Sequence, residues 1–403
     1  MLWTSDQFNP PHNYDFRMKF IYEELRNKNI KFVEFIRSME PSLTVLRHVL
    51  KRKRPVVYSY AIVKLAYYFA DIFGKKEKKE LNQLFPPPTA ETEQCFWYTV
   101  ATNYLIKFNN DIWAIKVLKF VLKFIGIKAS YISVAVSRNF HEVLACKLLG
   151  IKVVGIQHGA SLKSYSASDF VSEFDGEKSL GVDKYGLWSE WWREYHIKNS
   201  RLHKPEQLYV SGPMRPLEHK NVSLRSPSQK GGLIKVLFVS EQLAAPLEVM
   251  PYLQALISAE NISLYLKFRP YRDGFEDWLL VNHSNVLGKL GKEQILRGSM
   301  PEAIALSDVV VGSNSTGVLE SVLQLKPFVF FRTNKWGDYF ELKSFDPSYN
   351  FYAESPEELI DCVRQSQVIP PNILKKLQKR FFGNPYQNGS KWVVEQMEKF
   401  LRS

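Results

Sequence analysis

The sequence predicts an α/β protein with two doubly wound domains that face each other across a cleft, after a helical N-terminal portion. From residue 130 onward, short apolar runs with strand character alternate with helical patterns, which is typical of parallel sheets with right-handed crossovers. A polar stretch rich in Ser, Pro and Gly at 217–233 interrupts this alternation, and a fresh one follows it. The length of 403 residues is enough for two domains with a core each.

The first part of the chain, 1–128, has mainly helical patterns. The clearest helix is expected over 112–128, where Lys116, Lys119 and Lys123 share one face of an otherwise apolar segment. Two alternatives stay open for this helix. It lies on an anionic membrane, or it packs inward with its lysines in water.

The remaining elements are predicted from the period of their apolar residues. Strands are expected where β-rich apolar runs end at turn residues, and helices where apolar positions recur every three to four residues. The predicted strands cover 130–136, 151–156, 184–188 and 207–212 before the polar stretch, and 234–240, 262–268, 308–312 and 327–331 after it. The predicted domains are an N-terminal domain 1–216 (1–128 largely helical, 130–212 Rossmann-like), a linker 217–233, a C-terminal domain 234–385 and a C-terminal helix 386–403.

Charge and cysteine content limit the functional classes. The net charge of +13, with basic clusters at 51–54 and 75–79, indicates an acidic partner such as nucleic acid, anionic lipid or a phosphorylated substrate. No RNP-like, KH or helix-turn-helix signature accompanies the charge, so nucleic acid is not expected. Three widely spaced cysteines lack a CxxC pairing, which argues for a reducing compartment and against a zinc site or disulfide framework. With neither a signal peptide nor an apolar run of about 20 residues, a cytoplasmic location is expected.

The loop after Gly312 has the character of a phosphate site. Ser313, Ser315 and Thr316 lead from the end of a buried strand directly into a helix. Backbone N–H groups at a helix start, with hydroxyls beside them, suit a phosphate. Glu320, one turn further on, is placed to accept hydrogen bonds from ribose hydroxyls. The alternative is that Ser315 is an ordinary helix N-cap.

Two further strand ends carry candidate residues. Lys267 and Arg269 leave the sheet in LKFRP, where cations could clamp a diphosphate; the alternative is a solvated basic turn. His158 follows a buried strand in QHG, and Gly159 lets the backbone approach a ligand closely. A histidine there could act as a general base on a hydroxyl, or it could be structural.

These stretches, in this order, resemble the GT-B glycosyltransferases of bacterial surface polysaccharide synthesis. That group includes capsule-synthesis, sialyl- and Kdo-type transferases and teichoic-acid glycerophosphotransferases. The resemblance covers about 130–335 and rests on the strand ending in QHG, GPMRP before the linker, the KFRP turn and SDVVVGSNSTGVLES. It implies an N-terminal domain that binds the acceptor and a C-terminal domain that binds the nucleotide donor.

Carried over residue by residue, the resemblance implies a reaction centre and a donor site. His158 would be the base, with Glu142 as the second candidate. Arg269 stands where the family usually has histidine, so it would stabilise the leaving group by charge alone, without giving up a proton. The implied donor-binding residues are Ser313, Ser315, Thr316, Glu320, Lys267, Arg269 and Gln242, and the implied acceptor- or sugar-binding residues are Gln157, Gly159, Asp169 and Glu173.

The implied function is transfer of a sugar from a nucleotide-activated donor to a growing bacterial surface glycan, with inversion as the default. The motifs favour a CMP-linked acidic sugar such as Kdo or a sialic-type acid. No cofactor is expected, because the nucleotide-sugar is a substrate, and no metal, because the sequence has no DxD and no ligand-spaced His/Asp cluster. The expected partners are the donor, a glycan or lipid-linked glycan acceptor and an anionic membrane surface, at the inner face of the cytoplasmic membrane. The alternatives are a nucleotide-sugar 2-epimerase of the same fold, a CDP-glycerol-type glycerophosphotransferase and a noncatalytic binding module.

Overall fold

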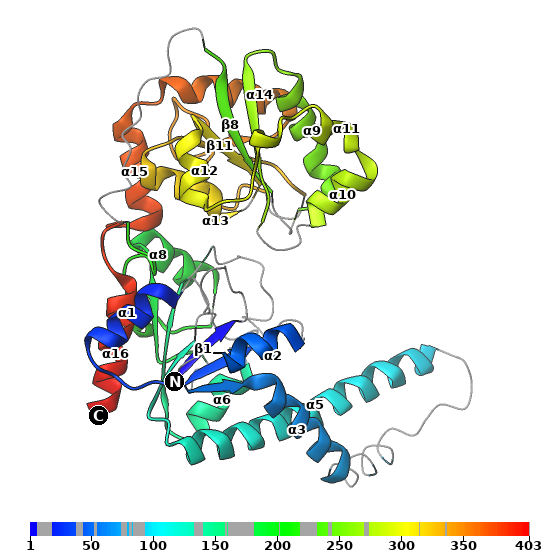
Figure 1. Cartoon of the computed structure of the whole chain (residues 1–403), viewed down its shortest axis with the longest axis vertical. Coiled ribbons are helices and arrows are strands. Elements are labelled where there is room, and N and C mark those ends of the chain that lie inside the picture. The colour runs from blue at the N-terminus through cyan, green and yellow to red at the C-terminus, as the bar shows by residue number, and fades with distance from the viewer. Residues whose placement is uncertain are drawn as a thin grey trace.

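Two separate parallel sheets with helices packed on them make up the protein (Figure 1). The computed structural model describes residues 1–5, 18–37, 43–51, 55–73, 79, 83, 93–132, 140–157, 159, 181–200, 202–217, 232–240, 244–269, 274–313, 315–334 and 337–402. Within these ranges the predicted two-domain α/β class is confirmed.

The first sheet has seven parallel strands in the order β3-β2-β1-β4-β5-β6-β7. The strands are β1 (Leu2–Ser5), β2 (Glu34–Arg37), β3 (Val56–Tyr58), β4 (Ala129–Ile132), β5 (Lys152–Ile156), β6 (Lys184–Leu187) and β7 (Leu208–Val210). The helices of this domain are α1 (Lys19–Asn27), α2 (Leu43–Leu50), α3 (Ser59–Phe73), α5 (Glu93–Ile125), α6 (Phe140–Leu148) and α8 (Glu190–Asn199). The four strands predicted between 130 and 212 correspond to β4 to β7, and 133–136 of the first of them lie outside the described residues.

The segment 1–128 also supplies three strands to this sheet that were not predicted from the sequence. β1 pairs directly with β4, and β2 and β3 extend the sheet beyond β1. Inside β2, the fully buried Glu34 accepts hydrogen bonds from Thr4 Oγ1 at 3.2 Å and from the Tyr22 hydroxyl. Strands of three or four residues are too short to give a periodic signal, and β2 also carries a charge inside the sheet. The segment 1–128 is largely helical, as predicted, and its three short strands were the part that the sequence did not reveal.

The second sheet has six parallel strands in the order β10-β9-β8-β11-β12-β13. The strands are β8 (Ile234–Val239), β9 (Ile262–Lys267), β10 (Ile295–Leu296), β11 (Val309–Gly312), β12 (Phe328–Phe331) and β13 (Tyr352–Ala353). The helices are α9 (Pro246–Ser258), α10 (Gly274–Asn282), α11 (Ser284–Gly288), α12 (Met300–Leu306), α13 (Thr316–Leu319, continued by a 3-10 turn Glu320–Gln324), α14 (Pro356–Gln365) and α15 (Pro371–Phe382). The four strands predicted here are present, and only the two-residue edge strands were not foreseen.

The last part of the chain returns to the first domain. α15 packs on α8, where Trp192 Nε1 donates to the Phe381 carbonyl at 3.0 Å. α16 (Gly389–Arg402) then lies against α1, β4 and β5 (Figure 1). Val393 and Met397 are buried there with residues of the first sheet. The predicted C-terminal helix thus completes the core of the first domain.

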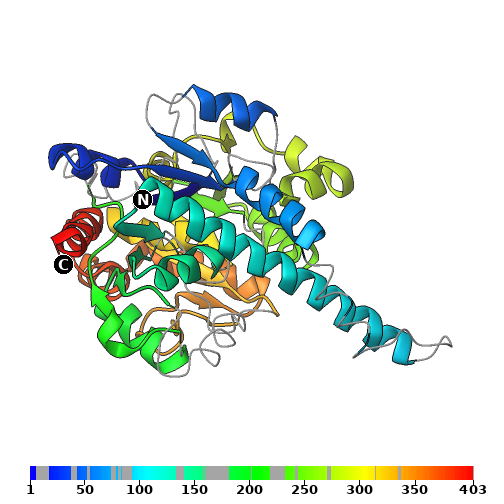
Figure 2. The same cartoon turned by 90° about the horizontal axis from the view of Figure 1, so that it is seen from below.

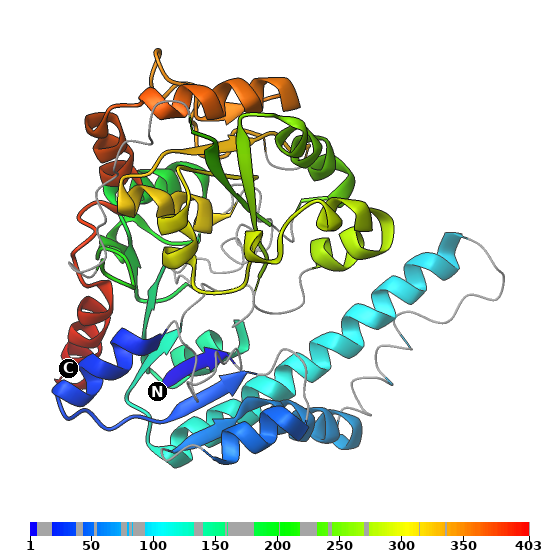
Figure 3. The ribbon, with the colours of Figure 1, turned by 45° about the horizontal axis from the view of Figure 1, so that its top comes forward.

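Helix α5 reaches well beyond the body of the first domain (Figures 2 and 3). It has 33 residues, and α3 packs along it. In the part of the chain that the structure describes, no helix combines the length and the apolar character needed to cross a bilayer.

Candidate functional site

Loops from the two domains meet where strands of both sheets end. β5 leads into the QHG loop of the first domain, and β11 leads into α13 of the second. A Cβ atom placed on Gly159 would lie 3.7 Å from Thr316 Oγ1. Open α/β sheets bind their ligands at the carboxyl ends of the strands. The structure therefore brings together two stretches that were predicted to form one site.

Gln157 holds the QHG loop in place. Its side chain is fully buried; Nε2 donates to the Gly159 carbonyl at 3.0 Å, and Oε1 accepts from the Trp188 backbone N–H at 3.2 Å. The Trp188 indole N–H also donates to the Gln157 carbonyl at 2.7 Å. A side chain so enclosed does not reach a ligand. The predicted acceptor contact of Gln157 is corrected to a positioning role, and Gly159 is the partly exposed member of the pair.

The loop after β11 starts a short helix. Ser315 is the N-cap of α13, where its Oγ accepts from the Gly317 backbone N–H at 3.3 Å, so that alternative is confirmed. Ser313 is buried, whereas Thr316 is partly exposed. A Cβ on Gly312 would lie 2.6 Å from a methyl of Val318, so only glycine lets α13 pack so closely on the strand end. Phosphate binding by this loop stays a prediction.

Glu320 forms an ion pair across the two domains. Its Oε1 lies 3.0 Å from Nη2 of Arg215, and the side chains are 18% and 45% exposed. Arg215 belongs to GPMRP in the first domain and was not among the residues predicted for the site. Ser390 Oγ of α16 donates to the Met214 carbonyl at 2.6 Å and holds this stretch. The GPMRP motif could have indicated that Arg215 belongs to the site, but the residues around it do not show that Glu320 is its partner.

The two cations at the end of β9, Lys267 and Arg269, lie in different surroundings. Lys267 is only 6% exposed, and its ammonium donates to the Phe268 carbonyl at 2.8 Å. Its own carbonyl accepts from the Ser240 backbone N–H at 3.1 Å, which ties β9 to β8. Arg269 is exposed. The predicted clamp of two cations is corrected, since only Arg269 is accessible to a ligand.

Glu142 lies in the first turn of α6 and is buried. It is near Cys146, whose pKa burial raises to about 12, with the Glu142 charge adding to the rise. The neighbouring His141 is 2.9 Å from the Asp111 carboxylate of α5. Glu142 follows β4, the strand that neighbours β5 in the first sheet, and its role as the second candidate base stays a prediction. The predicted residues His158, Gln242, Asp169 and Glu173 lie outside the described residues.

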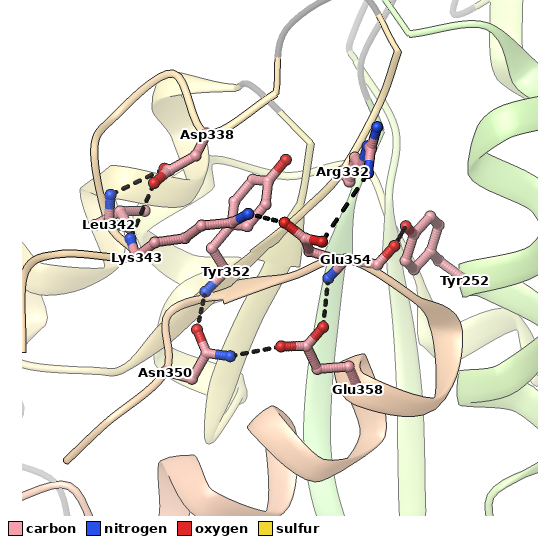
Figure 4. A network of polar contacts seen from close by, with 9 residues as sticks. All are labelled: Tyr252, Arg332, Asp338, Leu342, Lys343, Asn350, Tyr352, Glu354 and Glu358. Carbon is pink, nitrogen blue, oxygen red and sulfur yellow. Dashed lines mark hydrogen bonds and ion pairs between the residues drawn. The ribbon is translucent and has the colours of Figure 1, made fainter. Parts of the chain in front are cut away.

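A second polar cluster lies where β12 and β13 end (Figure 4). The Glu354 carboxylate pairs with Lys343 and lies 4.0 Å from Arg332. Its backbone N–H donates to Glu358 at 2.8 Å, and Glu358 accepts from Asn350 Nδ2 at 2.8 Å. Because the charges compensate one another, we interpret the cluster as a structural link between β13 and α14.

Within the described ranges, no group of three or more His, Cys, Asp or Glu side chains could hold a metal ion. The metal-independence expected from the sequence stays a prediction.

Several solved structures share this architecture, whereas no family model and no curated protein matches the sequence. A glycosyltransferase from Rickettsia africae superposes with a TM-score of 0.51 at 10% identity, over 100% of this chain and 98% of that one. HepE from Anabaena, solved with UDP and glucose, gives 0.54 at 12% identity over 99% of both chains. A UDP-GlcNAc 2-epimerase from Neisseria meningitidis, bound to UDP-GlcNAc, gives 0.54 at 14% identity over 99% of both. At these identities the likeness shows the fold, which is the two-domain GT-B arrangement.

Proposed function

We propose that this protein is a glycosyltransferase that moves a sugar from a nucleotide-activated donor to a glycan acceptor. The observation that carries the proposal is the close approach of Gly159 to Thr316, with Glu320 one turn further along. A loop of the acceptor-side domain and a loop of the donor-side domain that meet at one point suit direct transfer between two bound substrates. The fold shared with glycosyltransferases supports this function.

The proposed reaction is a single displacement. His158 takes the proton of an acceptor hydroxyl as its oxygen forms a bond to the anomeric carbon. The bond from that carbon to the donor phosphate oxygen breaks, and its electron pair leaves with the nucleotide. Hydroxyl and backbone N–H groups of Ser315 and Thr316, together with the Arg269 guanidinium, would stabilise the leaving phosphate. One displacement inverts the configuration at the anomeric carbon, and Glu142 is the second candidate base.

The donor base is decided by a thermal-shift panel with CMP, CDP, UDP, GDP and dTDP in the presence of EDTA. A nucleotide at one hundred times its dissociation constant adds about 2.7 kcal/mol to the free energy of unfolding. A selective shift with CMP supports the CMP-linked acidic sugar favoured by the motifs. A shift with UDP alone replaces it with a UDP-sugar, and the absence of any shift removes the nucleotide site and the proposed function.

Variants separate chemistry from donor binding. We expect His158→Ala to abolish turnover and to leave nucleotide affinity nearly unchanged. Glu320→Gln should weaken nucleotide binding. Glu260→Gln is the control and should leave nucleotide binding unchanged, because Glu260 is exposed and precedes β9, at the opposite end of the strands. An equal loss of nucleotide affinity in the His158 and Glu320 variants would put His158 at the phosphates instead.

The second candidate function is a nucleotide-sugar 2-epimerase. It is favoured by the superposition on UDP-GlcNAc 2-epimerases with TM-scores of 0.53 to 0.54, against 0.51 to 0.54 for the Rickettsia glycosyltransferase and HepE. The sequence argues against an epimerase, because QHGAS lacks the acidic residue of an HxE-like motif. Incubation with UDP-GlcNAc alone, followed by proton NMR, decides the matter. Appearance of the C2 epimer without an acceptor establishes the epimerase.

A further inference from the structure

The outer face of helices α3 and α5 is an exposed apolar surface. We call it the α3–α5 face. Its exposed large apolar side chains include Leu65, Tyr68 and Ile72 of α3 and Phe108, Phe120 and Phe124 of α5. No other pair of packed helices among the described residues exposes as many large apolar side chains.

The opposite face of α5 is part of the core. Val117, Leu118 and Leu122 are buried against the first sheet. Phe120 and Phe124, in contrast, are 71% and 83% exposed, and their ring centroids lie 6.3 Å apart. The helix can therefore pack inward on one side and still offer its other side to a membrane, so the two alternatives given for it above do not exclude each other. One face packs inward, and the other offers stacked aromatic rings to the solvent.

The same outer face of α5 is cationic. Lys116, Lys119 and Lys123 recur at intervals of three and four residues, which places them on one side of the helix. Lys116 and Lys123 are exposed, and Lys116 Nζ lies 4.4 Å from the centre of the Trp113 ring. The one acid on this part of α5, Asp111, pairs with His141 of α6. The lysine charges of this stretch thus have no acid on their own face of the helix to offset them.

We propose that the α3–α5 face binds the surface of an anionic lipid bilayer. Aromatic rings settle at the boundary between headgroups and acyl chains, while lysines extend their ammonium groups to anionic headgroups. A second copy of this chain is a poorer occupant, because it would set two rows of lysines against each other. The proposal goes beyond the sugar transfer proposed above and does not depend on it.

The test is sedimentation of the full chain with vesicles. Vesicles of phosphatidylcholine with 30% phosphatidylglycerol should bind the protein at low salt, and pure phosphatidylcholine vesicles should bind it at least about tenfold more weakly. Lys116→Gln with Lys123→Gln should weaken binding roughly fivefold per lysine. Phe120→Ser with Phe124→Ser should weaken it at least about tenfold, since both rings are exposed and their loss does not open the core.

Matched controls lie on the second domain. Leu280→Ser with Val281→Ser removes exposed apolar groups of α10, and Lys375→Gln with Lys376→Gln removes exposed charges of α15. These variants should bind vesicles as the parent does. The proposal is overturned if the parent does not bind anionic vesicles, if the controls lose as much binding as the α5 variants, or if Phe120→Ser with Phe124→Ser instead dissolves a dimer in sedimentation velocity. A nucleotide thermal shift on the same variants, expected to be unchanged, keeps this outcome separate from that of the proposed function.

Discussion

Replacing Arg215 by alanine should strengthen nucleotide binding, although it removes an ion pair at the proposed donor site. In the free protein Arg215 holds the Glu320 carboxylate at 3.0 Å, the group that is proposed to accept from the ribose. A nucleotide must therefore displace or share this contact. Removing Arg215 removes the competitor.

The size of the effect follows from the exposure of the pair. Two unit charges 3.0 Å apart attract by about 1.4 kcal/mol in bulk water and by about 5.5 kcal/mol at an effective dielectric constant of 20. With Arg215 45% exposed, solvent screening and side-chain entropy reduce this to about 0.2–1 kcal/mol. Arg215→Ala should thus tighten nucleotide binding by up to about fivefold. Glu320→Gln, which weakens a charged hydrogen bond, should cost about 1.5–3 kcal/mol, or roughly 10- to 150-fold in affinity.

Isothermal titration calorimetry with the nucleotide that gives a shift in the panel measures both effects. In the double variant the gain from Arg215→Ala should vanish, because its competitor role needs the Glu320 carboxylate. Arg364→Ala, which breaks an exposed ion pair with Asp361 on α14, is the control and should leave affinity unchanged. A loss of more than about tenfold in Arg215→Ala would refute the reasoning, since Arg215 would then bind the nucleotide itself.

Three further predictions concern stability and reactivity. Gly212 has a φ of 80°, and a Cβ there would come within 2.7 Å of the Gln387 side chain. Gly212→Ala should therefore destabilise the protein by about 2–4 kcal/mol in urea titrations. Gly288→Ala, with open space around it, is the control, and equal effects of the two substitutions would contradict the reasoning. Burial lowers the pKa of His203 to about 3, so between that value and the unfolded value of about 6.5 only the unfolded chain binds the proton. The free energy of unfolding should therefore be highest above about pH 6.5 and fall by about 1.4 kcal/mol per pH unit below it. In urea titrations over this pH range, His203→Phe should lessen the slope. Burial raises the pKa of Cys146 and Cys362 to about 12, so neither should react with iodoacetamide in the native protein, and rapid native labelling, read by peptide mass spectrometry, would contradict this.

The fold was more predictable in the second domain than in the first. β8, β11 and β12 are largely apolar runs of four to six residues, and buried parallel strands of this kind can be predicted from their composition. β1 and β2 have only four residues each, and Glu34 in β2 is stable in the core because Thr4 and Tyr22 donate to it. These donors lie 30 and 12 residues before Glu34 in the chain, so the residues next to Glu34 do not reveal that it belongs to a buried strand.

The location of the candidate site could be predicted from the sequence, but the side chains that face it could be predicted only in part. The order of the strand ends correctly put Gly159 and Thr316 together. It did not show that Gln157 and Lys267 turn into the protein, because strand position leaves the direction of a long side chain open. Arg215 was missed since its partner is 105 residues away in the other domain.

Because α16 lies on β4 and β5, the first domain cannot close its core while it is being synthesised. Those strands leave the ribosome roughly 230 residues before α16, which is on the order of 10–50 s at translation rates of about 5–20 residues per second. During that time the apolar side chains that α16 covers, among them Tyr131 and Ile156, are open to chaperones or to a neighbouring nascent chain. The domain that emerges first is therefore the last to be finished, and a ribosome stalled before residue 389 should carry a chain whose first domain is protease-sensitive.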